Sequence, residues 1–92
     1  MRRLDFKRSF VHGYKALNLD DQIKTDRAIR FLVASLESGE LRHGLGVKKL
    51  RNDIWKIRVD IRIRLCFQLK KDAIELILLG SHEDVRDFLK NI

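Results

Sequence analysis

The chain has 92 residues, 45% of them hydrophobic, and a formal net charge of +7. This length corresponds to one domain, and the apolar content suffices for one core and excludes a disordered chain. The single cysteine excludes a disulfide framework and favours a reducing compartment. No apolar run has the length of a signal peptide or of a bilayer-spanning helix. We therefore expect a soluble, cytoplasmic protein with one domain, residues 1–92, and no membrane partner.

The positive charge is concentrated in one third of the chain. Between Arg42 and Lys71 there are ten Lys/Arg and two acids, a balance of +8, while the remaining residues balance at −1. A field concentrated in this way attracts polyanions to one surface. The alternative is a charged surface that only keeps the protein soluble, but solubility needs charges of both signs dispersed. We therefore favour a binding surface for a polyanion.

The N-terminal half predicts a short strand followed by two helices. Leu4 and Phe6 alternate with charged residues, as in a strand, and residues 10–18 can form one or two helical turns. A longer helix is predicted over residues 20–39, with Asp20 or Asp21 as its N-cap and a glycine at its C-terminus. The apolar face of this helix is formed by residues at three- and four-residue steps: Ile23, Ile29, Leu32, Val33 and Leu36.

Residues 54–69, IWKIRVDIRIRLCFQL, alternate between apolar and polar. From Trp55 onward every odd position is apolar, as in a strand with one face on a core and one face in water. A single strand of this length would run about 50 Å, so the stretch must turn near its middle. Because the apolar set stays on odd numbers beyond the turn, the turn holds an odd number of residues. The simplest choice is residues 60–62, which pairs Val59 with Ile63.

This register places Arg58 directly opposite Arg64, and Lys56 opposite Cys66, on the polar face of the hairpin. Like charges opposite each other destabilise a sheet by a few tenths of a kcal/mol up to about 1. The pair makes sense if an anion binds between the two guanidinium groups; alternatively, the long side chains diverge into water. On this basis we expect Arg64→Ala to leave stability unchanged or to raise it by roughly a few tenths of a kcal/mol.

The C-terminal third predicts a turn, a central strand and a helix. Residues 70–73 form the turn, and residues 74–80 are apolar at nearly every position, as in a strand covered on both faces. Ser81 is expected to cap the last helix. The predicted fold class is α+β, a small single domain with two N-terminal helices packed on one face of a mostly antiparallel four-stranded sheet, in the order β-α-α-β-β-β-α.

The second half of the chain resembles the RelE/ParE superfamily of toxins from type II toxin–antitoxin pairs. The RelE pattern is aromatic-Lys-Ile-Lys-Leu, a short turn, Tyr-Arg-Leu-Val-Tyr-Gln-Val, and a later strand that ends in Gly-x-basic. The corresponding segments here are Trp55–Val59, Ile63–Leu69 and Gly80–His82. The resemblance implies a metal-independent endoribonuclease without a cofactor, which cleaves mRNA on the ribosome by attack of a ribose 2′-hydroxyl. It also implies a cognate antitoxin as partner.

The resemblance implies a catalytic set of four residues. Lys56 and Arg58 match the two strand lysines, Arg64 matches the hairpin arginine, and His82 matches the basic residue after the glycine. An arginine is almost never deprotonated, so Lys56 is the better general base, provided that neighbouring cations lower its pKa. His82 suits a general acid near neutral pH.

The resemblance and the concentrated charge together predict an RNA-binding surface. The family often has an aromatic residue in its last helix that stacks on a base; an ungapped match places Phe88 there, and a one-residue shift places Arg86. The basic residues expected to contact RNA are Lys48, Lys49, Arg51 and Arg62. No metal site is predicted, because no Cys pair or acidic cluster accompanies the histidines. The alternatives are a toxin that inhibits DNA gyrase and an inactive binding protein with the same fold.

Overall fold

The computed structural model describes residues 2–39 and 46–92, so Arg42, at the start of the basic stretch, lies outside it. The elements in chain order are β1 (Arg3–Phe6), α1 (Arg8–Ala16), α2 (Leu19–Glu37), β2 (Lys48–Lys49), β3 (Ile54–Arg58), β4 (Arg64–Leu69), β5 (Ala73–Gly80) and α3 (His82–Lys90). The predicted α+β class is confirmed. The strand count needs correction: the sheet has five strands in the order β1-β5-β4-β3-β2. The additional strand, β2, has only two residues, which is too short for alternation to reveal.

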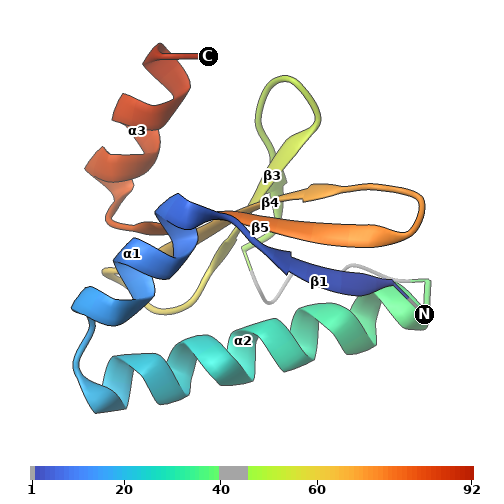
Figure 1. Ribbon diagram of the computed structural model, residues 1–92, viewed down its shortest axis with the longest axis horizontal. Coiled ribbons are helices and arrows are strands. Elements are labelled where there is room, and N and C mark those ends of the chain that lie inside the picture. The colour runs from blue at the N-terminus through green and yellow to red at the C-terminus, as the bar shows by residue number, and fades with distance from the viewer. Residues whose placement is uncertain (1, 40–45) are drawn as a thin grey trace.

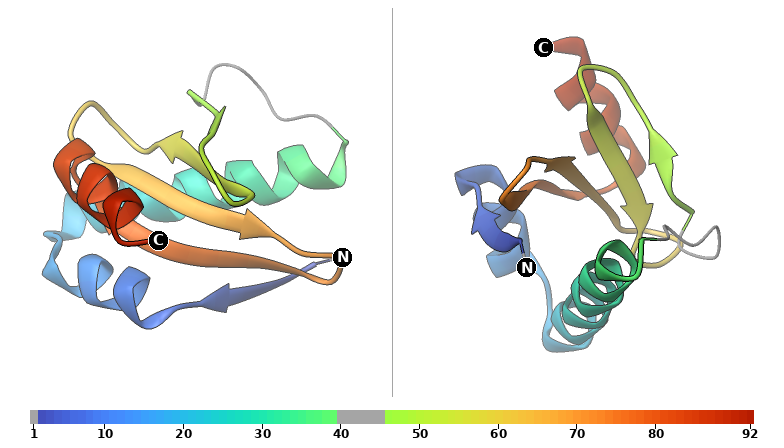
Figure 2. Two further views of the ribbon diagram at one scale, coloured as in Figure 1. Left: turned by 90° about the horizontal axis from the view of Figure 1, so that it is seen from above. Right: turned by 90° about the vertical axis from the view of Figure 1, so that its right-hand side faces the viewer.

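The helices cover both faces of the sheet (Figures 1 and 2). α1 and α2 pack on one face, as predicted, and bury a first core cluster that includes Phe10, Leu32 and Phe67. α3 lies against the other face, where Val85 packs with Ile54 and Cys66 in a second, smaller cluster. Only β1 and β5 pair in parallel, and the other strand pairs are antiparallel. The sheet is therefore mostly antiparallel, as predicted.

α2 begins one residue earlier than predicted and has a different cap. The Asn18 side chain accepts a hydrogen bond from the backbone N–H of Asp21 at 2.9 Å, so Asn18 is the N-cap, and neither Asp20 nor Asp21 is. Ile23 was expected in the core but is 40% exposed, because it lies two residues from the buried Thr25 and hence on the opposite side of the helix. Gly39 has a φ of +82° just beyond α2, as expected of a C-terminal glycine.

β5 is covered on both faces, as its continuous apolar sequence predicts. A β-bulge interrupts its pairing with β4: Cys66 pairs with Leu78, but the next residue, Phe67, pairs with Leu76. Ile77 is the extra residue, and it joins Leu78 in the cluster beneath α3. The bulge therefore supplies two consecutive apolar side chains to the α3 face of the sheet.

α1 approaches β5 so closely that only a glycine fits at their contact. A Cβ at Gly13 would overlap the carbonyl oxygen of Leu79 and would lie 3.2 Å from its carbonyl carbon.

The N-terminus of α3 is closed by two reciprocal hydrogen bonds. Ser81 Oγ accepts the backbone N–H of Asp84 at 3.1 Å, and the Asp84 carboxylate accepts the backbone N–H of Ser81 at 2.8 Å. This capping box confirms Ser81 as the cap. No helix of the described residues is long and apolar enough to cross a membrane.

Candidate active site

The turn between β3 and β4 has the predicted length and is closed by an aspartate. The backbone N–H of Val59 donates to the carbonyl oxygen of Ile63 at 2.9 Å, so residues 60–62 form the turn. Asp60 Oδ1 accepts the backbone N–H groups of Arg62 and Ile63, at 2.8 and 2.9 Å. These hydrogen bonds from the backbone to the Asp60 side chain stabilise the turn, which explains why it forms without a glycine.

The same hydrogen bonds make the stability of the protein depend on pH in the acidic range. Burial alone raises the pKa of Asp60, but the backbone N–H groups of Arg62 and Ile63 and the Arg62 guanidinium outweigh it, so the pKa lies below its ordinary 3.8. A depressed pKa contributes stability above the ordinary value, and this contribution is lost as the pH falls through the folded-state pKa. We therefore expect urea unfolding to show a larger loss of stability between pH 6 and pH 3 for the wild type than for Asp60→Asn. Equal losses would contradict this role for Asp60.

Four cations from three strands lie on one face of the sheet. Lys48 in β2 pairs with Lys56 in β3, and Arg58 in β3 pairs with Arg64 in β4, which confirms the predicted register of the two arginines. Since alternate residues of a strand share a face, these side chains lie on the same face as Cys66, the face that α3 partly covers. We call Lys48, Lys56, Arg58 and Arg64 the basic strip.

Lys56 lies at the centre of the basic strip and is half-buried. Burial lowers its pKa from the ordinary 10.5, and the positive charges of Arg64, Arg58 and Lys48 lower it further. The direction agrees with the expectation from the sequence, although burial contributes most. A lysine with a lowered pKa has a larger neutral fraction at a given pH and can accept a proton.

The Arg64 guanidinium is fixed by the turn. Nη1 of Arg64 donates to the carbonyl oxygens of Asp60 and Ile61, at 2.9 and 3.2 Å. Nε is buried and has no partner among the described residues, and both hydrogen bonds of this side chain with them are made by Nη1. These hydrogen bonds reverse the expected effect of Arg64→Ala on stability, because removing the side chain breaks two bonds in addition to relieving one repulsion.

Arg58, in contrast, is exposed and forms no hydrogen bond or ion pair with the described residues. Its side chain lies along the backbone of Gly46, where an added Cβ would stand 3.3 Å from the Cβ of Arg58 and 3.7 Å from its Nε. Gly46 also has a φ of +64°, a conformation that favours glycine. Within residues 2–39 and 46–92, no group therefore competes with a ligand for the donors of Arg58.

The predicted site residues of α3 differ in their surroundings. His82 is the first residue of α3 and is exposed, two residues beyond Gly80, which pairs with Arg64. Phe88 packs in the cluster that contains Val85, so its ring contributes to the core beneath α3. Of the two candidates for the family's stacking position, Arg86 is the exposed one.

The remaining predicted RNA contacts lie at the β2 edge and in the hairpin turn. Lys49 is paired with Asp53 at 3.3 Å and lies 5.8 Å from the centre of the Trp55 ring. Arg51 is exposed beside this edge. Arg62 points to the opposite side of the sheet, where it binds carboxylates of the turn and of α2. These carboxylates belong to Asp60 and Asp21, at 3.2 and 2.9 Å.

Cys66 is buried, which corrects the expectation that it lies on an open polar face. The alternation of β4 gives its face correctly, but α3 covers it there. Burial raises the pKa of the thiol to about 11, so it stays protonated near neutral pH and is not a nucleophile. In the described parts of the chain, no group of three or more His, Cys, Asp or Glu side chains is placed to hold a metal ion.

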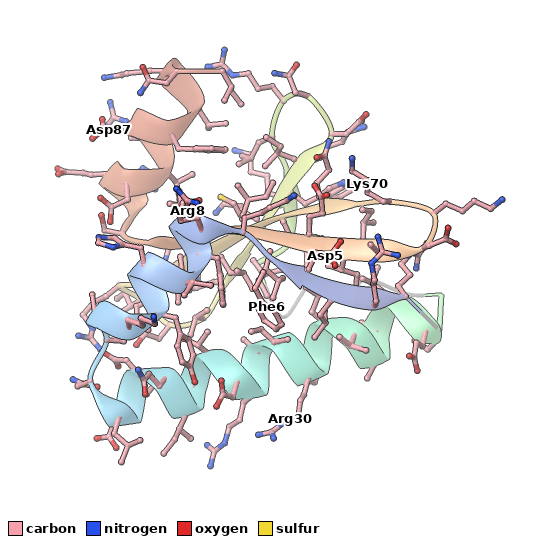
Figure 3. The ribbon with its side chains drawn as sticks, in the orientation of Figure 1. Asp5, Phe6, Arg8, Arg30, Lys70 and Asp87 are labelled. Atoms are coloured by element: carbon pink, nitrogen blue, oxygen red, sulfur yellow. The ribbon has the colours of Figure 1, made fainter. Side chains whose placement is uncertain are left out.

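A large open groove of about 1030 Å³ lies between α1 and α3. Its lining includes Leu78, Leu79 and Phe88, together with Arg8 on α1 and Asp87 on α3, both labelled in Figure 3. None of the four predicted catalytic residues lines it. Its apolar lining suits packing against another surface better than it suits chemistry on a phosphate, so we place the candidate site on the basic strip.

The five-stranded sheet, with α1 and α2 on one face and α3 on the other, is similar to the fold of solved toxins from toxin–antitoxin systems. A copper-bound mutant toxin from Helicobacter pylori is similar over 92% of this chain and 99% of its own, with a TM-score of 0.70 and 19% identity. The RelB–RelE antitoxin–toxin complex from Methanococcus jannaschii matches over 91% of this chain and 96% of that one, with a TM-score of 0.68 and 19% identity.

A third similar structure is the DinJ–YafQ complex from E. coli, with a TM-score of 0.69 and 14% identity over 92% of this chain and 98% of that one. No family model matches the chain, and no curated protein matches it. At these identities the likeness shows the fold, and it confirms the fold that the RelE/ParE resemblance implied.

Proposed function

We propose that the protein is the toxin of a type II toxin–antitoxin pair and acts as a metal-independent endoribonuclease that cleaves mRNA on the ribosome. The observation that carries the proposal is the basic strip, in which a half-buried lysine lies beside two opposed arginines. Cations gathered on one face attract an anion, and guanidinium groups match the geometry of a phosphate. The toxin fold of the similar structures supports RNA as that anion.

The proposed reaction is attack of a ribose 2′-hydroxyl on the adjacent phosphate. The 2′-oxygen forms a bond to phosphorus while the bond to the 5′-oxygen breaks, and the products are a 2′,3′-cyclic phosphate and a 5′-hydroxyl. Lys56 accepts the proton of the attacking hydroxyl, and His82 gives a proton to the leaving oxygen. Arg58 and Arg64 stabilise the negative charge that builds on the phosphate oxygens.

Lys56→Arg tests the proposed base, because an arginine keeps the charge but stays protonated. We expect cleavage to fall by about two orders of magnitude, in the range of lost general-base catalysis, with RNA affinity retained. In the wild type the rate should rise with pH up to a pKa below 10.5, as more Lys56 becomes neutral. Lys70→Arg, at the exposed β4–β5 turn (Figure 3), is the control and should change neither quantity. A wild-type pH profile that survives in Lys56→Arg would rule out Lys56 as the base.

The proposed partner is a cognate antitoxin. Structures with this fold are solved as complexes of toxin and antitoxin, among them YoeB–YefM from Staphylococcus aureus. An uncovered basic strip attracts RNA without regard to sequence, so we propose that acidic segments of the antitoxin cover it. Co-expression with the neighbouring reading frame should then give a complex whose net charge is closer to zero than +7.

Expression in growing cells tests the function as a whole. We expect growth arrest, with mRNAs cut within translated codons, and no arrest when Lys56→Arg is expressed to the same level. Growth arrest with intact mRNA and broken DNA would assign the protein to the gyrase-inhibiting branch. A wild-type protein that is harmless at high expression would contradict the toxin proposal.

A further inference from the structure

Arg62 connects the hairpin turn to a buried carboxylate on α2. Its Nη2 lies 2.9 Å from Oδ1 of Asp21 and 3.2 Å from Oδ2 of Asp60. The Asp21 side chain is only 7% exposed, whereas the Arg62 side chain is 62% exposed. A buried carboxylate needs a partner, and Arg62 is the cation that the described structure provides.

Asp21 is itself held firmly at the start of α2. It lies in the first turn of the helix, and its backbone N–H donates to the Asn18 cap at 2.9 Å. A carboxylate in the first turn is stabilised by the helix dipole. Asp21 is therefore a rigid anchor for the turn, and one turn further along α2 Lys24 adds a second contact, 3.5 Å from Oδ2 of Asp60.

The turn that Asp21 anchors also positions the side chain of Arg64. The two carbonyl oxygens that accept Arg64 Nη1 belong to Asp60 and Ile61, the first two residues of the turn. The positions of these carbonyls depend on the conformation of the turn and on its placement against α2. The contacts therefore run from Asp21 through Arg62 and the turn to the guanidinium of Arg64.

We propose that Arg62 is a positioning residue, whose ion pair with Asp21 fixes the turn on α2 and thereby fixes the Arg64 guanidinium in the basic strip. This assigns Arg62 a different role from the RNA contact that its charge alone predicts. The kinetic part of the test below rests on the proposed function, and the spectroscopic part does not.

Asp21→Asn is the decisive variant, because Asp21 is buried on the other side of the sheet and cannot touch RNA. It removes the ion pair of Arg62 with α2, leaves Asp60 as the partner of Arg62, and leaves no unpaired charge in the interior. If Arg62 only bound RNA, the loss of this ion pair would leave binding and turnover intact. If Arg62 positions Arg64, we expect kcat to fall on the order of ten- to a hundredfold, the scale of a small misplacement of a catalytic group. The Kd for RNA and the salt dependence of binding should stay unchanged.

Asp26→Asn is the matched control on the same helix. Asp26 accepts one hydrogen bond at 2.9 Å, from the hydroxyl of Tyr14 in α1, and has no contact with the turn. The same change at this position should therefore alter stability without altering kcat or Arg64.

The Nε–H resonance of Arg64 in an NMR spectrum supplies a readout that needs no RNA. Nε is buried, so its proton should exchange slowly with water in the wild type and in Asp26→Asn, and faster in Asp21→Asn. An unchanged resonance in Asp21→Asn, or an unchanged kcat together with weaker RNA binding in Arg62→Gln, overturns the proposal. If the wild type cleaves no RNA, the proposed function fails, and the resonance still decides whether the ion pair fixes Arg64.

Discussion

Replacement of Arg64 by alanine is expected to lower the rate of RNA cleavage by roughly two to three orders of magnitude, the effect of removing a preorganised donor to a developing oxyanion. Arg64 is the best-fixed cation of the basic strip, because two carbonyls of the turn hold its Nη1. A side chain fixed before the substrate binds loses little entropy when it meets the phosphate. The measurement is single-turnover cleavage of a defined RNA.

The same variant should also lose about 1–2 kcal/mol of stability, because two hydrogen bonds to the turn are broken. The rate must therefore be measured well below the unfolding temperature, with the folded fraction verified by circular dichroism. Arg30→Ala is the control: Arg30 is exposed and projects from α2 away from the sheet (Figure 3). Loss of stability together with unchanged cleavage would show that Arg64 is structural, and it would end the catalytic claim for the opposed arginines.

Gly13→Ala is expected to destabilise the protein by about 1–3 kcal/mol, the usual cost of overpacking. In an exposed helix the same change stabilises by about 1 kcal/mol, because alanine is the better helix former. Here the new methyl group would overlap the backbone oxygen of Leu79, and neither α1 nor β5 can move without disturbing the core. A loss of stability in Gly13→Ala therefore indicates close packing of α1 on β5, whereas a gain indicates that helix propensity dominates.

Thermal unfolding measures this difference directly. For a domain of this size, 1 kcal/mol corresponds to a shift in Tm of about 4–8 °C. Lys15→Ala, at an exposed position of α1, should stay within about 0.5 kcal/mol of the wild type. A Gly13→Ala variant with a higher Tm than the wild type would show that α1 does not approach β5 as closely as described.

The geometry of the hairpin could be predicted from sequence because it depends on local rules. Side chains alternate with a period of two, and the parity of the apolar positions fixes the length of the turn. Together these place Arg58 opposite Arg64 without any knowledge of the rest of the fold. The capping box at Ser81 was accessible for the same reason, since its partner Asp84 is three residues away.

The parts that sequence could not predict depend on contacts between distant segments. Arg62 and Asp21 are separated by 41 residues, and only the packing of α2 against the sheet brings them together. From its charge alone, Arg62 was therefore predicted to contact RNA. Likewise, alternation gives the face on which Cys66 lies, but whether α3 covers that face is a matter of tertiary structure.

The short edge strand β2 also affects whether two copies of the protein can pair through their sheet edges. Every sheet edge carries unpaired N–H and C=O groups on which another chain can pair, and natural sheets limit this with short edge strands and lysines. β2 offers only two residues, Lys48 and Lys49, and both are exposed. A second copy paired edge to edge would bring its own lysines against these, and like charges repel across a strand pair. The charges proposed to attract RNA thus also oppose aggregation through this edge.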